Sequence, residues 1–142
     1  MTLRIGSART RLTPFWGVEL AGWGYYLGRT WQRVRDHTAA TALVVESGGT
    51  AIALVAVDLM YADAAFCDRV RALVAEAVPL SPQAICVACS HSHNTPMTAV
   101  VRGVGEVHPE YAEWAARQAR PESVRPSLAI ARSWNSVWAS GP

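Results

Sequence analysis

The fold is decided by residues 39–59, which have the sequence AATALVVESGGTAIALVAVDL. Two apolar runs rich in β-branched residues flank Ser47-Gly48-Gly49, and this pattern is typical of a β-hairpin. We predict strands over residues 39–46 and 50–59. Residues 51–57 are apolar at every position, so the second strand is expected to be central and covered on both faces.

A helix and another strand are predicted after the hairpin. Asp63 can cap a helix that begins near Ala64 and ends before Pro79, because apolar residues recur on one stripe between these points. Residues 84–89, Ala-Ile-Cys-Val-Ala-Cys, form a short apolar run typical of a buried strand. The order strand, helix, strand favours a parallel crossover. The predicted fold class is therefore α/β, a mixed sheet with a β-hairpin and a strand–helix–strand crossover.

The segments on either side of this unit add one strand and one helix. Residues 3–11 predict a first strand, and a second helix is predicted to open at His108-Pro109-Glu110 and to stop before Pro121. We assign residues 3–118 to one domain portion. Residues 119–142 form an irregular tail, because no helical or strand period continues through them.

Composition limits the functional classes. The chain has 142 residues and a formal net charge of +2, and its basic residues are scattered arginines without the basic patch of a nucleic-acid-binding protein. No apolar stretch is long enough to span a membrane, and the N-terminus lacks the apolar region of a secretory signal. We therefore expect a cytoplasmic protein without a transmembrane segment. The oligomeric state stays open.

The cysteines do not indicate a disulfide framework. They are Cys67, Cys86 and Cys89, an odd number in a chain without a secretory signal. Cys86 and Cys89 lie inside an apolar run, where a strand directs positions three apart to opposite faces. We expect two buried thiols rather than a redox or metal-binding pair.

The strongest chemical signal follows the run 84–89. Residues 90–96 are Ser-His-Ser-His-Asn-Thr-Pro. In extended backbone His91 and His93 would point the same way, and at the end of a buried strand both imidazoles would face one crevice. Neutral imidazole is a common zinc ligand. Asp58, at the end of the preceding strand, would lie at the same sheet edge, either as a turn or capping group or as a site residue.

The remaining polar and aromatic signals are weaker. His37 and His108 are each expected to be surface or capping residues. Residues 15–35 combine five aromatic side chains later than Phe15 with several glycines, a composition typical of a loop. This loop either caps the edge of the core or forms the wall of a pocket for an apolar ligand.

Several segments, taken in order, carry a family resemblance. They are Arg4-Ile5-Gly6-Ser7-Ala8, Ala21-Gly22-Trp23-Gly24, Arg35-Asp36, residues 40–45, Val57-Asp58-Leu59 and residues 89–96. The last segment resembles the Thr-His-Thr-His-Ser-Gly-Pro signature of the neutral/alkaline non-lysosomal ceramidase family. The resemblance covers residues 3–118 and corresponds to the N-terminal part of that family's catalytic domain.

The resemblance implies a zinc-dependent hydrolase of sphingolipid metabolism that cleaves the amide of ceramide. It implies that His91 is a metal ligand, that His93 is a catalytic residue beside the substrate, and that Gly22 lines the substrate site. Zinc would lower the pKa of a bound water and polarise the amide carbonyl. His93 would then position the attack or stabilise developing charge. The implied partner is an N-acyl amide or a similar lipid-like small molecule.

The chain also departs from the family pattern. Asn94-Thr95 replaces the usual Ser-Gly, and the family's second His ligand, its Glu and Tyr ligands and its catalytic serine follow the part that this chain resembles. The composition of residues 119–142 would fit a truncation or a shifted reading frame. We therefore expect a fragment that is inactive alone, with an incomplete zinc site. Two alternatives stay open: a small metal-dependent hydrolase completed by oligomerisation, with Asp58, His91 and His93 as ligands, or a non-catalytic module that binds an apolar ligand.

Overall fold

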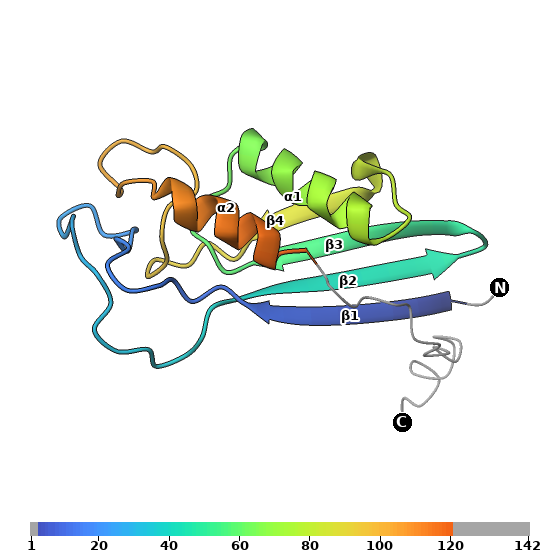
Figure 1. Cartoon of the computed structure of the whole chain (residues 1–142), viewed down its shortest axis with the longest axis horizontal. Coiled ribbons are helices and arrows are strands. Elements are labelled where there is room, and N and C mark those ends of the chain that lie inside the picture. Colours follow the sequence, from blue (N-terminus) through green and yellow to red (C-terminus); the bar gives the residue numbers. More distant parts are fainter. Residues whose placement is uncertain (1–2, 121–142) are drawn as a thin grey trace, which may run out of the picture.

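The computed structural model describes residues 3–120, which form a four-stranded sheet with two α-helices on one face (Figure 1). In chain order the elements are β1 (Leu3–Arg11), β2 (Ala39–Ser47), β3 (Thr50–Val57), α1 (Ala64–Ala77), a short 3-10 turn η1 (Pro82–Ala84), β4 (Ile85–Cys89) and α2 (Pro109–Gln118). Most of the predicted tail, residues 119–142, lies outside the described residues. The arrangement confirms the predicted α/β class.

The strand order is β1-β2-β3-β4, with β1, β2 and β3 antiparallel and β4 parallel to β3. The hairpin between β2 and β3 closes more tightly than predicted, because Ser47 already pairs with Thr50 and only two residues remain for the turn. These residues are Gly48 and Gly49, with φ of 58° and 82°. Positive φ at both positions is the geometry that favours glycine in two-residue hairpin turns. The predicted hairpin and parallel crossover are both confirmed.

Both helices begin at the residues that the sequence indicated. The Asp63 carboxylate accepts the Phe66 backbone N–H at 2.8 Å and caps α1. The ring of His108 caps α2 through the Tyr111 N–H, with Pro109 at the first helical position. α1 buries one stripe against the sheet, formed by Phe66, Val70, Leu73 and Val74.

The helices also pair with each other. Arg69 of α1 donates two hydrogen bonds to Glu113 of α2, at 2.8 and 3.1 Å, and Arg117 donates a third at 2.7 Å. The hydrogen bonds from Arg69, together with the positive charge of both guanidinium groups, lower the pKa of the Glu113 carboxyl to about 2. This ion pair fixes α2 beside the crossover helix.

Tyr111 connects α2 to the chain that leaves β1. Its side chain is fully buried and its hydroxyl donates to the Leu12 carbonyl at 2.8 Å. Burial raises the pKa of the Tyr111 phenol well above its usual range, since the charged form would lose its hydration. The hydroxyl therefore remains a hydrogen-bond donor at any pH at which the fold is stable.

The two faces of the sheet differ. On the face beneath the helices, the core includes Val44, Val55 and Val57. On the other face Ile52 and Leu54 of β3 are exposed, and no segment among residues 3–120 covers them. The expectation that β3 is covered on both faces is therefore wrong for the described part of the chain. The reason is topological: the crossover helix and α2 lie on the same face (Figure 1).

β4 is likewise less enclosed than predicted, because it is an edge strand. Cys86 points to the open face and is exposed, whereas Cys89 is partly buried on the helix-covered face. The prediction of two buried thiols is thus wrong for Cys86. Burial raises the pKa of the Cys89 thiol to about 11. Of the helices within residues 3–120, neither has the length and apolar character needed to cross a bilayer.

Candidate functional site

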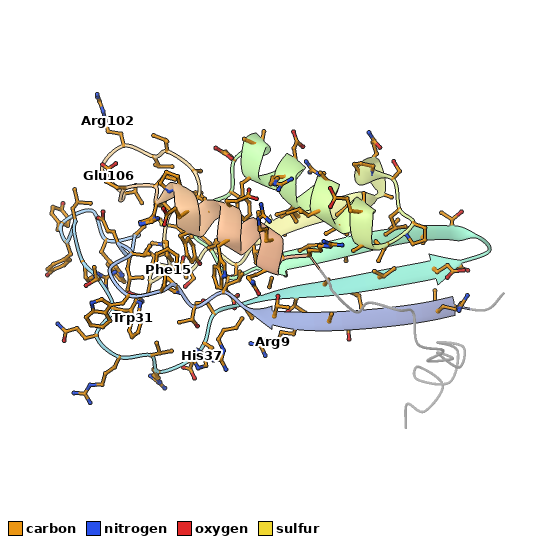
Figure 2. All side chains as sticks on the ribbon, in the orientation of Figure 1. Arg9, Phe15, Trp31, His37, Arg102 and Glu106 are labelled. Carbon is orange, nitrogen blue, oxygen red and sulfur yellow. The ribbon has the colours of Figure 1, made fainter. Side chains whose placement is uncertain are left out.

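The candidate site lies beyond the carboxyl ends of β3 and β4, where the long loops of the chain gather. Figure 2 shows Phe15, Trp31, Arg102 and Glu106 at this end of the molecule. The segment after β4 runs beside the segment after β3, since the Ser90 N–H donates to the Val57 carbonyl at 3.0 Å and the Ser92 N–H to the Leu59 carbonyl at 3.3 Å. The end of the crossover therefore carries both histidines of the motif.

The backbone turns sharply at His91. Its φ is 60°, and it is the only non-glycine residue with a positive φ among residues 3–120. Such a conformation costs about 1–3 kcal/mol and is maintained where the surrounding structure requires it, often at functional sites. The prediction that His91 and His93 share extended backbone is therefore wrong, because the chain leaves the sheet direction between them.

A backbone carbonyl fixes each imidazole. The Nδ1 atom of His91 lies 3.0 Å from the Met60 carbonyl oxygen, and the Nδ1 atom of His93 lies 2.9 Å from the Gly22 carbonyl oxygen. A carbonyl oxygen can only accept, so Nδ1 carries the hydrogen in both neutral rings. In each ring this leaves Nε2 with a free lone pair. Metal-binding histidines are commonly oriented in this way by the other ring nitrogen.

The two rings are close to each other. Their centroids are 5.0 Å apart with an angle of 79° between the ring planes. Aromatic side chains flank the pair: Tyr61 packs edge-on against His91 at 5.0 Å, and Trp23 against His93 at 5.5 Å. The structure thus brings His91 and His93 together, although by a turn rather than by strand alternation.

Gly22 lies directly against the backbone of His93. Its φ is +105°, and a Cβ atom at this position would lie 2.6 Å from the His93 Cα and 2.8 Å from the His93 carbonyl oxygen. Only glycine satisfies both the conformation and the space. The structure therefore places Gly22 next to His93, where its carbonyl orients the ring.

Arg29 connects the glycine-rich loop to the histidine segment. Its Nη1 atom donates to Asn94 Oδ1 at 2.9 Å, and its Nη2 atom donates to the His93 carbonyl at 3.4 Å. Sequence reasoning missed Arg29, because its partners are more than sixty residues away and nothing in the local pattern marks it. Asn94 is one of the positions where the chain departs from the ceramidase signature, and here it accepts the hydrogen bond of this arginine.

Asp58 has a structural role in the described residues. Its Oδ2 atom accepts the Ala39 N–H at 2.9 Å, and its own N–H donates to the Ala39 carbonyl at 2.9 Å. It therefore closes the end of the β2–β3 ladder, which is the turn-group alternative. His37 is exposed, and its Nδ1 atom lies 2.8 Å from Thr13 Oγ1.

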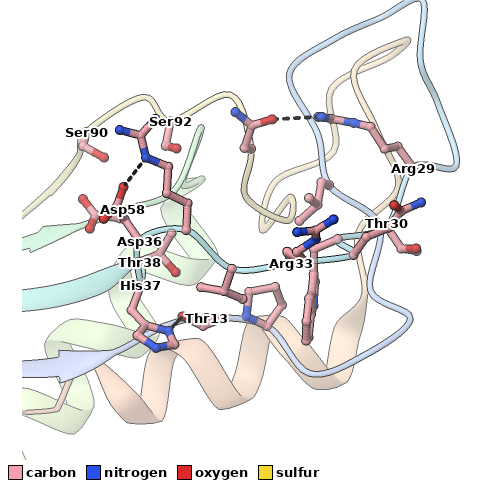
Figure 3. A pocket seen from close by; sticks show the side chains of 17 residues that line it. Thr13, Arg29, Thr30, Arg33, Asp36, His37, Thr38, Asp58, Ser90 and Ser92 are labelled. Carbon is pink, nitrogen blue, oxygen red and sulfur yellow. Dashed lines mark hydrogen bonds and ion pairs between the residues drawn. The ribbon is translucent and has the colours of Figure 1, made fainter.

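A cavity of about 710 Å³ lies on the side of the histidine segment that faces Asp58 (Figure 3). Ser90, Ser92 and Asn94 line it, whereas His91 and His93 do not. Figure 3 shows Ser90, Ser92 and Asp58 on one side of the cavity and Arg29 on the other. The residues of the segment thus alternate between this polar cavity and the paired imidazoles.

The described residues offer an incomplete metal site. Within residues 3–120 no group of three or more His, Cys, Asp or Glu side chains is placed to hold a metal ion. Asp58 is accordingly not brought together with His91 and His93. Two imidazoles with free Nε2 atoms fit part of a zinc coordination sphere, and catalytic zinc commonly needs three protein ligands.

Two solved structures are similar to this chain. A neutral ceramidase from Pseudomonas aeruginosa matches with a TM-score of 0.70 and 19% sequence identity, over 84% of this chain and 20% of that one. A ceramidase complexed with C2 matches with a TM-score of 0.58 and 15% identity, again over 84% and 20%. No family model and no curated protein matches the sequence. The described fold is therefore ceramidase-like, and the chain spans about one fifth of the length of these neighbours.

Proposed function

We propose that this chain supplies the histidine-bearing part of a zinc-dependent amide hydrolase of the ceramidase type, which acts on an N-acyl amide such as ceramide. One observation carries the proposal: His91 and His93 are adjacent, and a backbone carbonyl orients each ring so that its Nε2 atom is free. The ceramidase-like fold and the family resemblance of residues 89–96 support it.

The two histidines have different roles in this proposal. His91 is the zinc ligand, held in place by the Met60 carbonyl and by its own strained backbone. Zinc, when bound, supplies a Lewis acid that polarises the substrate carbonyl. His93 lies beside the substrate, where its Nε2 atom accepts a proton from the attacking group or, when protonated, donates a hydrogen bond to the carbonyl oxygen.

The residues around His93 keep it ready for this task. The Gly22 carbonyl sets the ring orientation, and Arg29 holds the backbone carbonyl of His93 through Nη2. The Trp23 ring covers one side of the imidazole and restricts the approach of water. A catalytic base must be positioned before its pKa matters, and these contacts supply the positioning.

Two imidazoles are too few for tight zinc binding, so the remaining ligands would come from outside residues 3–120. Under this proposal the purified chain neither retains stoichiometric zinc nor hydrolyses a ceramide-like amide. Zinc retained at one equivalent together with turnover would refute the incomplete site and would favour a small enzyme that completes its own centre.

The proposal is tested by the tautomer and the metal response of each ring. Long-range ¹H–¹⁵N spectra should show the Nδ1–H tautomer at His91 and His93, and zinc titration should perturb Nε2 of His91 first. His91→Ala should abolish the zinc response, whereas the control His37→Ala should leave it unchanged. An Nε2–H tautomer at His91, or a zinc response that survives His91→Ala, would contradict the proposed role.

A further inference from the structure

The exposed apolar side chains of this protein are concentrated at the site end. Apart from Ile52 and Leu54 on the open sheet face, every large apolar residue that is strongly exposed belongs to the loops beyond β3 and β4. These are Phe15, Trp16, Trp23, Tyr25, Tyr26, Leu27, Tyr61 and Val100. Tyr25 and Val100 are the extremes, with 99% and 90% of their surface exposed. Side chains so exposed project outward and cannot form the floor of a groove.

The two loops that carry Tyr25 and Val100 are joined to each other. The Gly22 N–H donates to the Val104 carbonyl at 3.2 Å, and a Cβ atom on Gly24 would lie 2.9 Å from the Gly103 carbonyl oxygen. The Glu19 carboxylate accepts the N–H of Gly28 at 2.7 Å and that of Glu106 at 3.3 Å. The projecting side chains therefore stand on one braced support.

We propose that residues 23–27 together with Val100 form a docking surface for a lipid bilayer. Tryptophan and tyrosine have an apolar ring and a polar atom, and they favour the boundary between lipid and water. Projecting side chains can insert into a fluid lipid surface, which has no fixed shape to match. Trp23 belongs to both the docking surface and the site, because it packs on His93 at 5.5 Å.

The charge of the loops is complementary to an anionic membrane. Residues 15–35 and 97–107 contain four arginines, at positions 29, 33, 35 and 102, and two glutamates, at positions 19 and 106. Glu19 is already occupied by backbone N–H groups. The excess of guanidinium groups favours contact with anionic headgroups and should make docking sensitive to salt.

The docking surface deepens the proposed function, since a substrate with acyl chains would reach the imidazoles from the lipid surface. It does not depend on zinc or on turnover. His91→Ala, which removes the proposed metal ligand, should leave docking unchanged. Loss of the zinc response and loss of docking are therefore separate results, and either can fail alone.

The test is sedimentation of the full chain with vesicles of phosphatidylcholine alone and of phosphatidylcholine with phosphatidylserine. The chain should bind the anionic vesicles more strongly, and tryptophan emission should shift to the blue. The double substitution Tyr25→Ser, Val100→Ser should weaken vesicle binding by about tenfold, because it removes two apolar side chains from the lipid contact.

The matched control is Ile52→Ser, Leu54→Ser, which removes exposed apolar side chains from the open sheet face. It should leave vesicle binding unchanged. Equal losses in the two double variants, or no binding to either vesicle, would overturn the proposal. So would a self-associated chain that binds no vesicle and becomes monomeric with Tyr25→Ser, Val100→Ser, because the surface would then fit a second copy.

Discussion

Replacing Gly22 with alanine tests the contact on which the orientation of His93 depends. The substitution adds one methyl group at a position where the backbone has φ of +105° and faces the His93 backbone. Two costs are expected, one from the conformation and one from the space. Both should lower the free energy of unfolding, and the second should also displace the His93 ring from the Gly22 carbonyl.

The magnitude follows from the geometry at Gly22. An L residue at this φ costs about 1–2 kcal/mol. The new Cβ atom would lie 2.6 Å from the His93 Cα, and overpacking of this kind costs about 1–3 kcal/mol, since no rotamer change relieves a backbone clash. Gly22→Ala should therefore reduce the free energy of unfolding by about 2–5 kcal/mol.

Gly17→Ala is the matched control. Gly17 has φ of +89°, and a Cβ atom there would meet no atom within 4 Å. It should show the conformational cost without the clash. Urea unfolding measures the stability of both variants, and ¹H–¹⁵N spectra report the His93 tautomer. If Gly22→Ala and Gly17→Ala agree within about 0.5 kcal/mol, the close approach to His93 does not constrain the fold and the reasoning is wrong.

Three other substitutions test contacts described above. Arg29→Ala should remove the hydrogen bond to Asn94 at 2.9 Å, destabilise the chain by about 1–2 kcal/mol, and broaden the His93 ring signals in NMR spectra. Tyr111→Phe should cost about 1–2 kcal/mol in urea unfolding, because it leaves a buried carbonyl without its donor at 2.8 Å. The folded-state pKa of Glu113 is lowered to about 2, so its contribution to stability is present above its ordinary value of 4.5 and is lost as the pH falls towards 2. Because the ion pair is half exposed, Glu113→Gln should remove only about 0.5–1 kcal/mol and flatten the pH dependence between these values; an unchanged slope would contradict the assignment.

The fold was largely predictable because its elements are marked locally. The Gly48-Gly49 turn, the Asp63 cap and the His108-Pro109 helix start are each determined by residues close in sequence, and the structure places each of them as expected. The parallel crossover follows from the order of these elements. Local patterns of this kind need no knowledge of the rest of the molecule.

The faces of the sheet were less predictable. An apolar strand reports that its side chains avoid water, and it does not report which segment covers them. The open face of β3 is therefore visible only once both helices are seen on the other side (Figure 1). The same limit explains why Cys86 was expected to be buried.

The candidate site was predictable in composition and not in construction. The spacing of His91 and His93 indicated two neighbouring imidazoles, but the turn at φ of 60° that brings them together has no signal in the sequence. The contacts of Gly22 and Arg29 with the histidine segment join residues more than sixty positions apart. A single sequence does not reveal such contacts.

The position of Cys86 gives the open sheet face a chemical reporter. This thiol is exposed in the middle of that face, whereas burial raises the pKa of both Cys67 and Cys89 and so slows their reaction with maleimide. The labelling rate of one sulfur therefore measures how accessible the outer side of β4 is. In any assembly where another polypeptide shields that side, the fast labelling phase should disappear while the fold remains intact.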